Sequence, residues 1–233
     1  MNAPSSDSSL RLNKHLALTL GISRREADNL IDKGLVTING EKATLGARFQ
    51  AGDHIAVRGR TITDTPDFMY LALNKPVGYV SSRKQQGDSP TIYSLLPRQY
   101  HTLKPVGRLD KDSSGLLLLS NDGDFTQRMT HPSFHKTKHY EVALDKDLEP
   151  LHQQMIADYG VQLEDGVSQL QLTRLSEADR KHWQVTMHEG RNRQIRRTFA
   201  ALGYLVVELH RTNFGNYSLD DMKPGEFKIV DMR

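Results

Sequence analysis

Leucines recur at helical spacing near the start of the chain. Three of them lie four residues apart between positions 12 and 20 and are followed by Gly21, which predicts a short helix that ends at this glycine. Ser23 and Glu26 then stand at the spacing of a capping box, and the stretch after them closes on Gly34, which predicts a second short helix. The chain is therefore expected to open with a pair of short helices.

A small sheet is expected to follow the two helices. The dipeptide Asn39-Gly40 lies between apolar positions and is a strong signal for a tight hairpin turn. The segment 53–59, DHIAVRG, has the pattern of a strand that returns along the hairpin. Two short helices that lead into a small sheet predict a compact α/β module.

Composition along the chain indicates where modules begin and end. Residues 1–9 are small and polar and are expected to be disordered. Order is expected over 10–58, and the polar, turn-rich segment 59–68 is expected to link this module to a second one at 69–233.

The second module mixes buried apolar runs, alternating stretches and helical periodicity. We expect strands at 69–76, 115–122, 139–145, 182–190 and 204–211, and helices at 150–160 and 193–203. This irregular order predicts an α+β domain with a mixed sheet rather than a doubly wound fold.

Composition narrows the chemistry. The chain has 233 residues, 37% of them hydrophobic, and no cysteine, so disulfides, a thiol nucleophile and a cysteine zinc site are excluded. Its ten histidines show no HExxH or HxH spacing, so no metal site is expected. Without a long apolar run or a signal-like start, the protein is expected in the cytoplasm and away from membranes.

Positive charge is concentrated at the front. The net charge is only +3, yet residues 11–60 hold nine basic and five acidic side chains. Three segments stand in order in this part of the chain: RLNKHLA, SRREADNLIDKGLVTINGEKAT and AGDHIAV. Together they resemble the S4 RNA-binding domain. The resemblance implies contacts with structured RNA, and an ordinary solvent-exposed helix face remains the alternative for any single residue. The best candidates for phosphate contacts are Lys14, Ser23, Arg24, Arg25 and Lys42.

The motif DKDSSG allows three interpretations. Asp110, Asp112, Ser114 and Gly115 occupy calcium-loop positions, but Asn121 stands where a bidentate glutamate is needed. A plain turn, in which Asp and Ser side chains bond their own backbone, is the second interpretation. The third is catalytic, because an aspartate can attack an electrophilic carbon and leave again without a cofactor.

An extended backbone at this motif has a geometric consequence. Arg108 and Asp110 would then point to the same side, so that the arginine could enter the RNA stack while the acid meets an extruded base. The turn-forming sequence DSSG would give Asp112 a loop-shaping role instead.

Five sequence blocks follow one another along the second module: LALNKPVGYVSS, VGRLDKDSSGLLLLSNDGDF, KHYEV, EGRNRQIRRTFAALG and VVELHRTNFGNYSL. In this order they resemble the RsuA/RluB/RluE/RluF family of ribosomal RNA pseudouridine synthases. The resemblance implies site-specific isomerisation of a flipped-out uridine in ribosomal RNA, with no cofactor. It also implies that the partner is ribosomal RNA or an assembling ribosomal subunit. We expect the enzyme to be a monomer.

The resemblance also assigns roles to matching residues. It implies that Asp110 is the nucleophile and that Arg108 helps to flip the nucleotide. It implies that Tyr140 packs against the flipped base and assists in removing the proton from C5, as a catalytic residue. It implies that Arg196 pairs with the aspartate.

Helical geometry adds an expectation about the arginines. The apolar stripe that starts at Ile195 leaves Arg196 on its flank, within reach of a half-buried carboxylate. Arg193 and Arg197 are expected roughly opposite the stripe, where they would either bind RNA phosphates or form an exposed basic face.

Two other functions use the same features. An RNA N-glycosidase would employ the same carboxylate but release the base to water, and it would usually need a second acid as proton donor. A non-catalytic RNA-binding ribosome-assembly factor would need only the basic module.

Overall fold

The computed structural model describes residues 9–62, 66–83 and 87–232. The chain forms two compact units, Met1–Phe68 and Met69–Arg233, which we describe separately. The tail expected to be disordered lies outside the described residues, apart from Ser9. Within the described residues, no helix has both the length and the hydropathy needed to cross a membrane.

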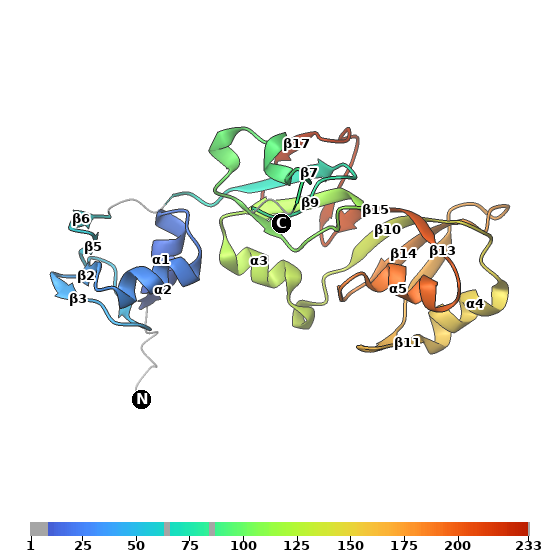
Figure 1. The fold of residues 1–233 in the computed structure, drawn as a ribbon, viewed down its shortest axis with the longest axis horizontal. Helices are drawn as coiled ribbons and strands as arrows, with labels where there is room; N and C mark the ends of the chain where they lie inside the picture. The colour runs from blue at the N-terminus through green and yellow to red at the C-terminus, as the bar shows by residue number, and fades with distance from the viewer. Residues whose placement is uncertain (1–8, 63–65, 84–86, 233) are drawn as a thin grey trace, which may run out of the picture. The chain divides into compact units, whose positions relative to one another are not determined.

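The first unit contains two helices beside a four-stranded sheet with the strand order β3-β2-β5-β6 (Figure 1). A further pair of short strands, β1 and β4, lies outside this sheet. The elements are β1 Leu10–Arg11, α1 Leu12–Thr19, α2 Arg24–Asp32, β2 Val36–Ile38, β3 Glu41–Lys42, β4 Arg48–Phe49, β5 Ile55–Val57 and β6 Arg60–Thr61.

Local signals determine the ends of these elements, as the sequence indicates. The Ser23 hydroxyl accepts a hydrogen bond from the Glu26 amide at 3.1 Å, and the Glu26 carboxylate accepts one from the Ser23 amide at 2.7 Å, which completes the capping box of α2. Asn39 and Gly40 both have positive φ, as the hairpin between β2 and β3 requires.

The first sheet extends further than the sequence indicates. A second tight turn at Arg58 and Gly59, both with positive φ, lets Arg60 and Thr61 pair with β5 as strand β6. These two residues fall in the segment 59–68 that we assigned to a linker. The polar composition of the turn conceals the returning strand, because short edge strands bury little apolar surface.

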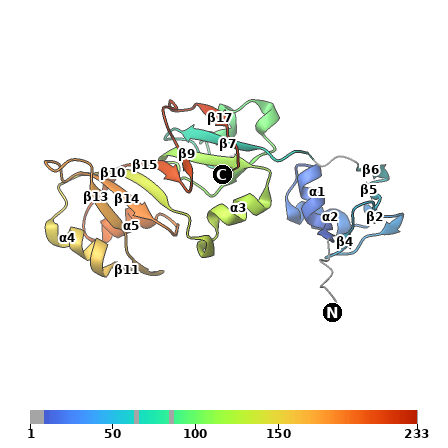
Figure 2. The same ribbon diagram turned by 180° about the vertical axis from the view of Figure 1, so that it is seen from behind.

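The second unit is built on a nine-stranded mixed sheet, which Figures 1 and 2 show from opposite sides. Its main path has the order β13-β14-β10-β15-β9-β7-β17, with β16 paired to β15 and β8 paired to β9. The strands are β7 Tyr70–Lys75, β8 Lys104–Val106, β9 Ser114–Ser120, β10 Lys138–Leu144, β13 Gln171–Arg174, β14 His182–Met187, β15 Val206–Phe214, β16 Tyr217–Ser218 and β17 Phe227–Ile229.

Helices and a separate hairpin complete the second unit. They are α3 Gly123–Thr130, α4 Pro150–Gln154 with a π-helical turn Met155–Tyr159, α5 Gln194–Ala201, 3-10 turns Ile92–Leu95, Arg98–Tyr100 and Pro132–Phe134, and the hairpin of β11 Val161–Leu163 with β12 Gly166–Ser168. The predicted fold class, a small S4-like α/β module followed by a mixed-sheet α+β domain, is confirmed. Sequence periodicity missed α3, which begins because the Asp122 carboxylate accepts the amides of Asp124 and Phe125.

The leucines of β9 pack into two separate hydrophobic clusters. Leu117 and Leu119 belong to the larger cluster, with α5 and the π-helical turn, whereas Leu116 and Leu118 belong to a second cluster with α3. Both faces of this strand are therefore covered, which explains an unbroken apolar run where a half-exposed strand would alternate.

The strand β9 meets β15 in the only parallel pairing among the described strands. At this junction Gly115 has a φ of +103°, and a Cβ atom there would lie 2.3 Å from the Arg211 carbonyl oxygen. Only glycine permits this close approach. The glycine of DKDSSG thus joins the loop before β9 to the centre of the sheet.

Candidate active site

A cavity of about 260 Å³ lies beside this junction. Its wall comes from the loop 107–113 before β9, from β10 and β15, and from the segment 190–195 that leads into α5. Of the predicted site residues, it brings together Arg108, Asp110, Tyr140 and Arg193. Arg196, Arg197 and the S4-unit candidates do not line it.

The loop that carries Asp110 begins with Gly107, whose φ is +75°. Leu109 is buried in the larger core and also lines the cavity, together with its neighbours Arg108 and Asp110. The side chain of Asp110 is 33% exposed. Arg108 is exposed and makes no hydrogen bond or ion pair with any residue that the structure describes. The chain then turns, since the Ser113 amide donates to the Asp110 carbonyl at 3.1 Å.

A buried lysine supports the end of this loop. Lys75 closes β7 and is fully buried, and its Nζ donates to the carbonyl oxygens of Ser113 at 2.6 Å and Pro76 at 3.0 Å. Burial lowers the pKa of Lys75 to about 8, against the opposing attraction of Asp110 and Asp112. Sequence reasoning missed this residue, although a lysine at the end of an apolar strand and before a proline was a usable signal.

Arg193 contacts both acids of the loop. It precedes the first residue of α5 and has a φ of +46°, a left-handed conformation that is uncommon for arginine. Its guanidinium donates to the two carboxylate oxygens of Asp112 at 2.9 and 2.8 Å, and Nη1 lies 3.5 Å from Oδ2 of Asp110. The bond from Arg193 lowers the pKa of Asp112. Asp112 is therefore held in a structural ion pair, which is consistent with a loop-shaping role.

Arg196 binds a different acid from the one expected. Its Nε lies 3.3 Å from the Asp112 carboxylate, and its two Nη atoms donate to the carbonyl oxygens of Asp112 at 2.7 Å and Val206 at 2.5 Å. The expected direct pair with Asp110 is absent from the contacts of the described residues. The helix starts after Arg193, so the left-handed turn at that residue directs Arg193, rather than Arg196, toward Asp110.

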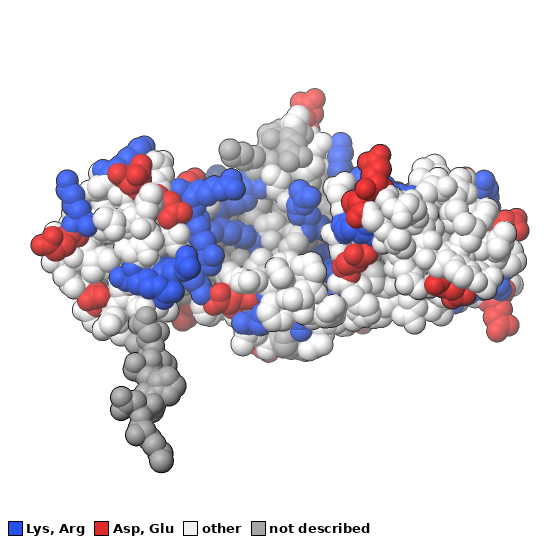
Figure 3. All heavy atoms as spheres, turned by 90° about the horizontal axis from the view of Figure 1, so that it is seen from below, with Lys and Arg blue, Asp and Glu red and all other residues white. Residues whose placement is uncertain are grey.

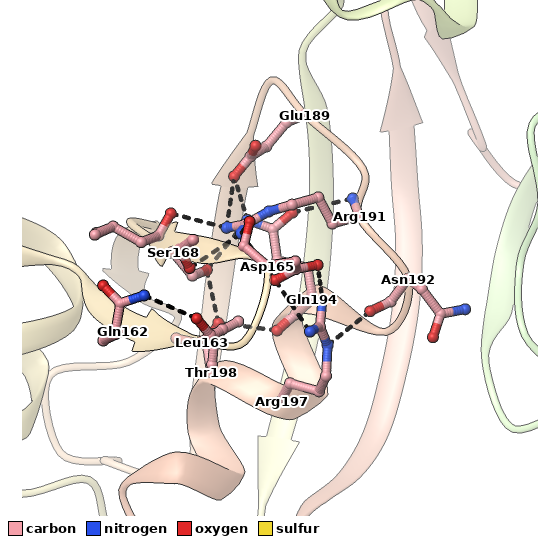
Figure 4. Close-up of polar contacts among 12 residues, drawn as sticks. Gln162, Leu163, Asp165, Ser168, Glu189, Arg191, Asn192, Gln194, Arg197 and Thr198 are labelled. Carbon is pink, nitrogen blue, oxygen red and sulfur yellow. Dashed lines mark hydrogen bonds and ion pairs between the residues drawn. The ribbon is translucent and has the colours of Figure 1, made fainter.

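Arg197 does not extend freely into solvent, as Figure 4 shows. Its Nη atoms donate to both carboxylate oxygens of Asp165, in the turn between β11 and β12, at 3.1 and 2.6 Å. Arg191 binds the same carboxylate at 3.0 Å. Arg193 and Arg197 were expected either to bind RNA phosphates or to form an exposed basic face. In the structure each remains partly or fully exposed and is paired with an aspartate that is distant in the sequence.

Two aromatic rings and a buried arginine line the cavity beside β15. Tyr140 is 8% exposed and packs in the larger core. The guanidinium of Arg211 lies 6.0 Å from the centre of the Tyr140 ring and 4.9 Å from that of Phe214, and its Nε donates to the Leu116 carbonyl at 2.8 Å. Lys138 also lies over the Phe214 ring, with its Nζ 5.2 Å from the ring centre. Burial lowers the pKa of Lys138 to about 8.

The predicted RNA-contact residues of the first unit differ in exposure. Arg24, Arg25 and Lys42 are exposed and Lys14 is half-buried. The Ser23 hydroxyl is engaged in the capping box of α2, so its main role in the structure is to begin the helix. Figure 3 shows Lys and Arg side chains spread over the viewed face of this unit, with Asp and Glu among them.

The cavity wall holds one carboxylate together with several arginine and lysine side chains. Asp110 is the only carboxylate that lines it among the described residues. No group of three or more His, Cys, Asp or Glu side chains in the described part of the chain is arranged to hold a metal ion. A single carboxylate in the wall of a cavity that also has an aromatic lining suits nucleophilic attack on a planar ligand held against the ring.

Comparison with known proteins agrees with this geometry. The family described as RNA pseudouridylate synthase matches residues 69–201, and the S4 domain family matches residues 10–55. The chain is 37% identical to the ribosomal small subunit pseudouridine synthase A of Pasteurella multocida, over 95% of this chain and 96% of that protein. It is 35% identical to the ribosomal large subunit pseudouridine synthase B of Bacillus subtilis, over 93% of this chain and 90% of that protein.

A solved structure described as a pseudouridylate synthase is also similar. It superposes with a TM-score of 0.68 at 34% sequence identity, and the match covers 96% of both chains. The fold and cavity thus define an RNA-modifying isomerase with an S4 domain. The chain belongs to the RNA pseudouridine synthase family.

Proposed function

We propose that this enzyme converts uridine to pseudouridine in ribosomal RNA, with Asp110 as the nucleophile. The observation that supports this assignment best is that Asp110 alone among the described carboxylates lines the cavity. It is also the more loosely held acid of its loop, since its ion pair with Arg193 is 3.5 Å long, whereas Asp112 is bound bidentately.

The reaction is balanced without a cofactor. A carboxylate oxygen of Asp110 bonds to C1′ of the target ribose as the bond from C1′ to N1 of uracil breaks. The uracil turns in the cavity, C5 bonds to C1′, and the carboxylate leaves. The proton on C5 is lost to solvent and N1 takes up one proton, so that product and substrate have the same atoms.

Two cavity residues would present the nucleotide to Asp110. Arg108 is exposed beside it, where its side chain would take the place of the extruded uridine in the RNA stack. Tyr140 offers a ring in the cavity wall against which the flipped base would pack.

The substrate is proposed from the printed functions of the relatives and from the first unit. The relatives named above act on ribosomal RNA, of the small subunit in one case and of the large subunit in the other. The exposed Arg24, Arg25 and Lys42, with Lys14, would contact phosphates, so that the free rRNA or an assembling subunit binds one copy of the enzyme.

Ribosomal RNA transcripts that carry tritium at uridine C5 test this proposal. Isomerisation releases tritium to water and leaves pseudouridine in the chain. An N-glycosidase would release labelled uracil instead, and a binding protein would release neither. Asp110 has no second carboxylate beside it in the described cavity wall, which favours isomerisation over a two-acid glycosidase. Labelled uracil, or binding without release, would contradict the proposed reaction.

The role of the first unit has its own test in the full-length chain. Replacing Arg24 and Arg25 together by glutamate should weaken rRNA binding and reduce the slope of log K against log salt by roughly 1.5 to 2, because two phosphate contacts are lost. The rate of isomerisation at saturating enzyme should stay near that of the wild type. An unchanged salt slope would show that these arginines do not contact phosphate.

A further inference from the structure

The end of β7 and the segment 76–83 after it bond to the loop 107–113 at several points. The Gly78 amide donates to the Lys111 carbonyl at 2.8 Å, and Lys75 Nζ donates to the Ser113 carbonyl at 2.6 Å. These bonds support the second half of the loop, after Asp110. The first half is supported by a different residue of the same segment.

Ser81 binds the residue between Arg108 and Asp110. Ser81 is 9% exposed. Its hydroxyl donates to the Leu109 carbonyl at 2.8 Å and accepts from the Leu109 amide at 3.2 Å. These are the only hydrogen bonds of the Leu109 backbone within the described residues. One hydroxyl therefore satisfies both peptide groups of a buried residue that lies outside any strand.

The two bonded peptide groups are those that lead to the functional side chains. The Leu109 amide belongs to the peptide plane shared with Arg108, and the Leu109 carbonyl to the plane shared with Asp110. Fixing both planes fixes the directions in which the two flanking side chains leave the backbone. The buried Leu109 side chain and the Ser81 hydroxyl thus hold the loop from two sides.

We propose that Ser81 is a positioning residue that sets the orientation of Asp110 and Arg108 for the reaction. The inference rests on the proposed role of Asp110 as nucleophile. Ser81 is not among the described residues that line the cavity, and its hydroxyl bonds to the Leu109 backbone, so we infer that it acts through that backbone. Small misplacements of a reacting group are enough to slow an oriented reaction strongly, while binding over the rest of an RNA surface is kept.

A series at position 81 tests the hydrogen bonds separately from packing. Ser81→Ala removes both bonds, whereas Ser81→Cys fills the same space with a group that donates and accepts only weakly. The rate of tritium release from C5-labelled rRNA transcripts is measured with enzyme in excess, so that it reports one turnover, and the Kd for the same RNA is measured in parallel.

We expect the single-turnover rate to fall about tenfold in Ser81→Ala and by a smaller factor in Ser81→Cys, with the Kd unchanged within about twofold. Ser94→Ala is the matched control, because the exposed Ser94 hydroxyl also donates to a backbone carbonyl, that of Thr91 at 2.8 Å, away from the loop 107–113. It should react at the wild-type rate.

Three results would overturn the proposal. The first is a wild-type rate in Ser81→Ala. The second is a slow Ser81→Ala beside a wild-type rate in Ser81→Cys, which would indicate that packing alone matters. The third is a loss of RNA affinity as large as the loss of rate. Circular dichroism at the assay temperature corrects each rate for the folded fraction, and Ser81→Cys decides the question where Ser81→Ala does not fold.

A reference variant separates this proposal from the one that it rests on. Asp110→Asn in the same assay should be inactive. An active Asp110→Asn would contradict the nucleophile whatever Ser81 does, whereas an inactive Asp110→Asn beside a fully active Ser81→Ala would contradict only the positioning role.

Discussion

The arginines of the segment 189–197 pair with aspartates in two groups, one in the β11–β12 hairpin and one in the loop 107–113. In the hairpin group, the single carboxylate of Asp165 accepts hydrogen bonds from both Arg191 and Arg197, at distances from 2.6 to 3.1 Å. Arg191 also donates to the carbonyl oxygens of Asp165, Gly166 and Val167, so the hairpin turn and the arginine segment form one network (Figure 4).

The loop group has two aspartates and divides them. Asp112 accepts a bidentate bond from Arg193 and an ion pair from Arg196, much as Asp165 does in the hairpin. Asp110 has only the longer contact with Arg193 and opens to the cavity.

The contrast separates structural acids from a reactive one. A carboxylate whose oxygens are occupied by two guanidinium groups is held in one geometry and has few lone pairs left for a substrate. A carboxylate with a single, longer contact to one arginine still has an oxygen available for attack. By this criterion Asp112 resembles Asp165, and Asp110 differs from both.

The largest difference between the groups should appear when their arginines are replaced. Arg196→Lys keeps the charge but loses the planar contacts to Asp112 and Val206, so single-turnover isomerisation should fall about a hundredfold while RNA affinity is largely kept. Arg197→Lys, in the next position of α5, should cost no more than about threefold. Both rates come from the tritium-release assay. Equal losses in the two variants would remove the distinction between the loop group and the hairpin group.

A moderate effect is expected when the hairpin loses its acid. Asp165→Asn removes the charge that holds Arg191 and Arg197, so the cavity segment 190–193 should loosen and the single-turnover rate should fall about fivefold at low salt. Because these side chains are partly exposed, the difference from wild type should shrink as salt is raised.

Glu164→Gln, a neighbour outside the bidentate pairs, is the control for Asp165→Asn. It should react within about twofold of the wild type at every salt concentration. A larger loss in Glu164→Gln than in Asp165→Asn would attribute the effect to the net charge of the hairpin rather than to the pairs.

The smallest effect concerns stability in acid. The bond from Arg193 lowers the pKa of Asp112 below its ordinary value of 3.8, so the stabilisation is present above that pH and is lost as the pH falls through the lower, folded value. Because the Asp112 side chain is 46% exposed, the contribution should not exceed about 1 kcal/mol. Urea unfolding at pH 6 and pH 3 should give a smaller difference in the free energy of unfolding for Asp112→Asn than for the wild type. A larger pH-dependent difference in Asp112→Asn than in the wild type would show that the ion pair of Asp112 with Arg193 does not stabilise the fold.

Local sequence signals predicted most of the fold. The capping box at Ser23 and the Asn39-Gly40 turn are decided by neighbouring residues, so they are visible in the sequence and confirmed in the structure. The strand β6 and the helix α3 escaped because they begin in polar segments, where a turn or a single capping aspartate replaces the periodic pattern.

The sequence indicated several residues of the cavity wall but not the pairings of the arginines. Arg108, Asp110 and Tyr140 line one cavity, whereas Arg196 does not. The partners of the arginines depend on the left-handed conformation of Arg193 and on the approach of the distant β11–β12 hairpin, and neither leaves a periodic trace in the sequence. Long-range pairing of charges is a property of the tertiary structure.

The direct test of the central claim is a comparison of Asp110→Asn with Asp112→Asn in the same preparation of C5-tritiated ribosomal RNA. Asparagine keeps the size of either side chain and part of its hydrogen bonding, but its amide cannot attack carbon as a carboxylate does. We expect Asp110→Asn to bind RNA as the wild type does and to release no tritium. We expect Asp112→Asn to keep a rate within about tenfold of the wild type. Tritium release by Asp110→Asn, or its loss in Asp112→Asn alone, would show that the nucleophile has been assigned to the wrong aspartate.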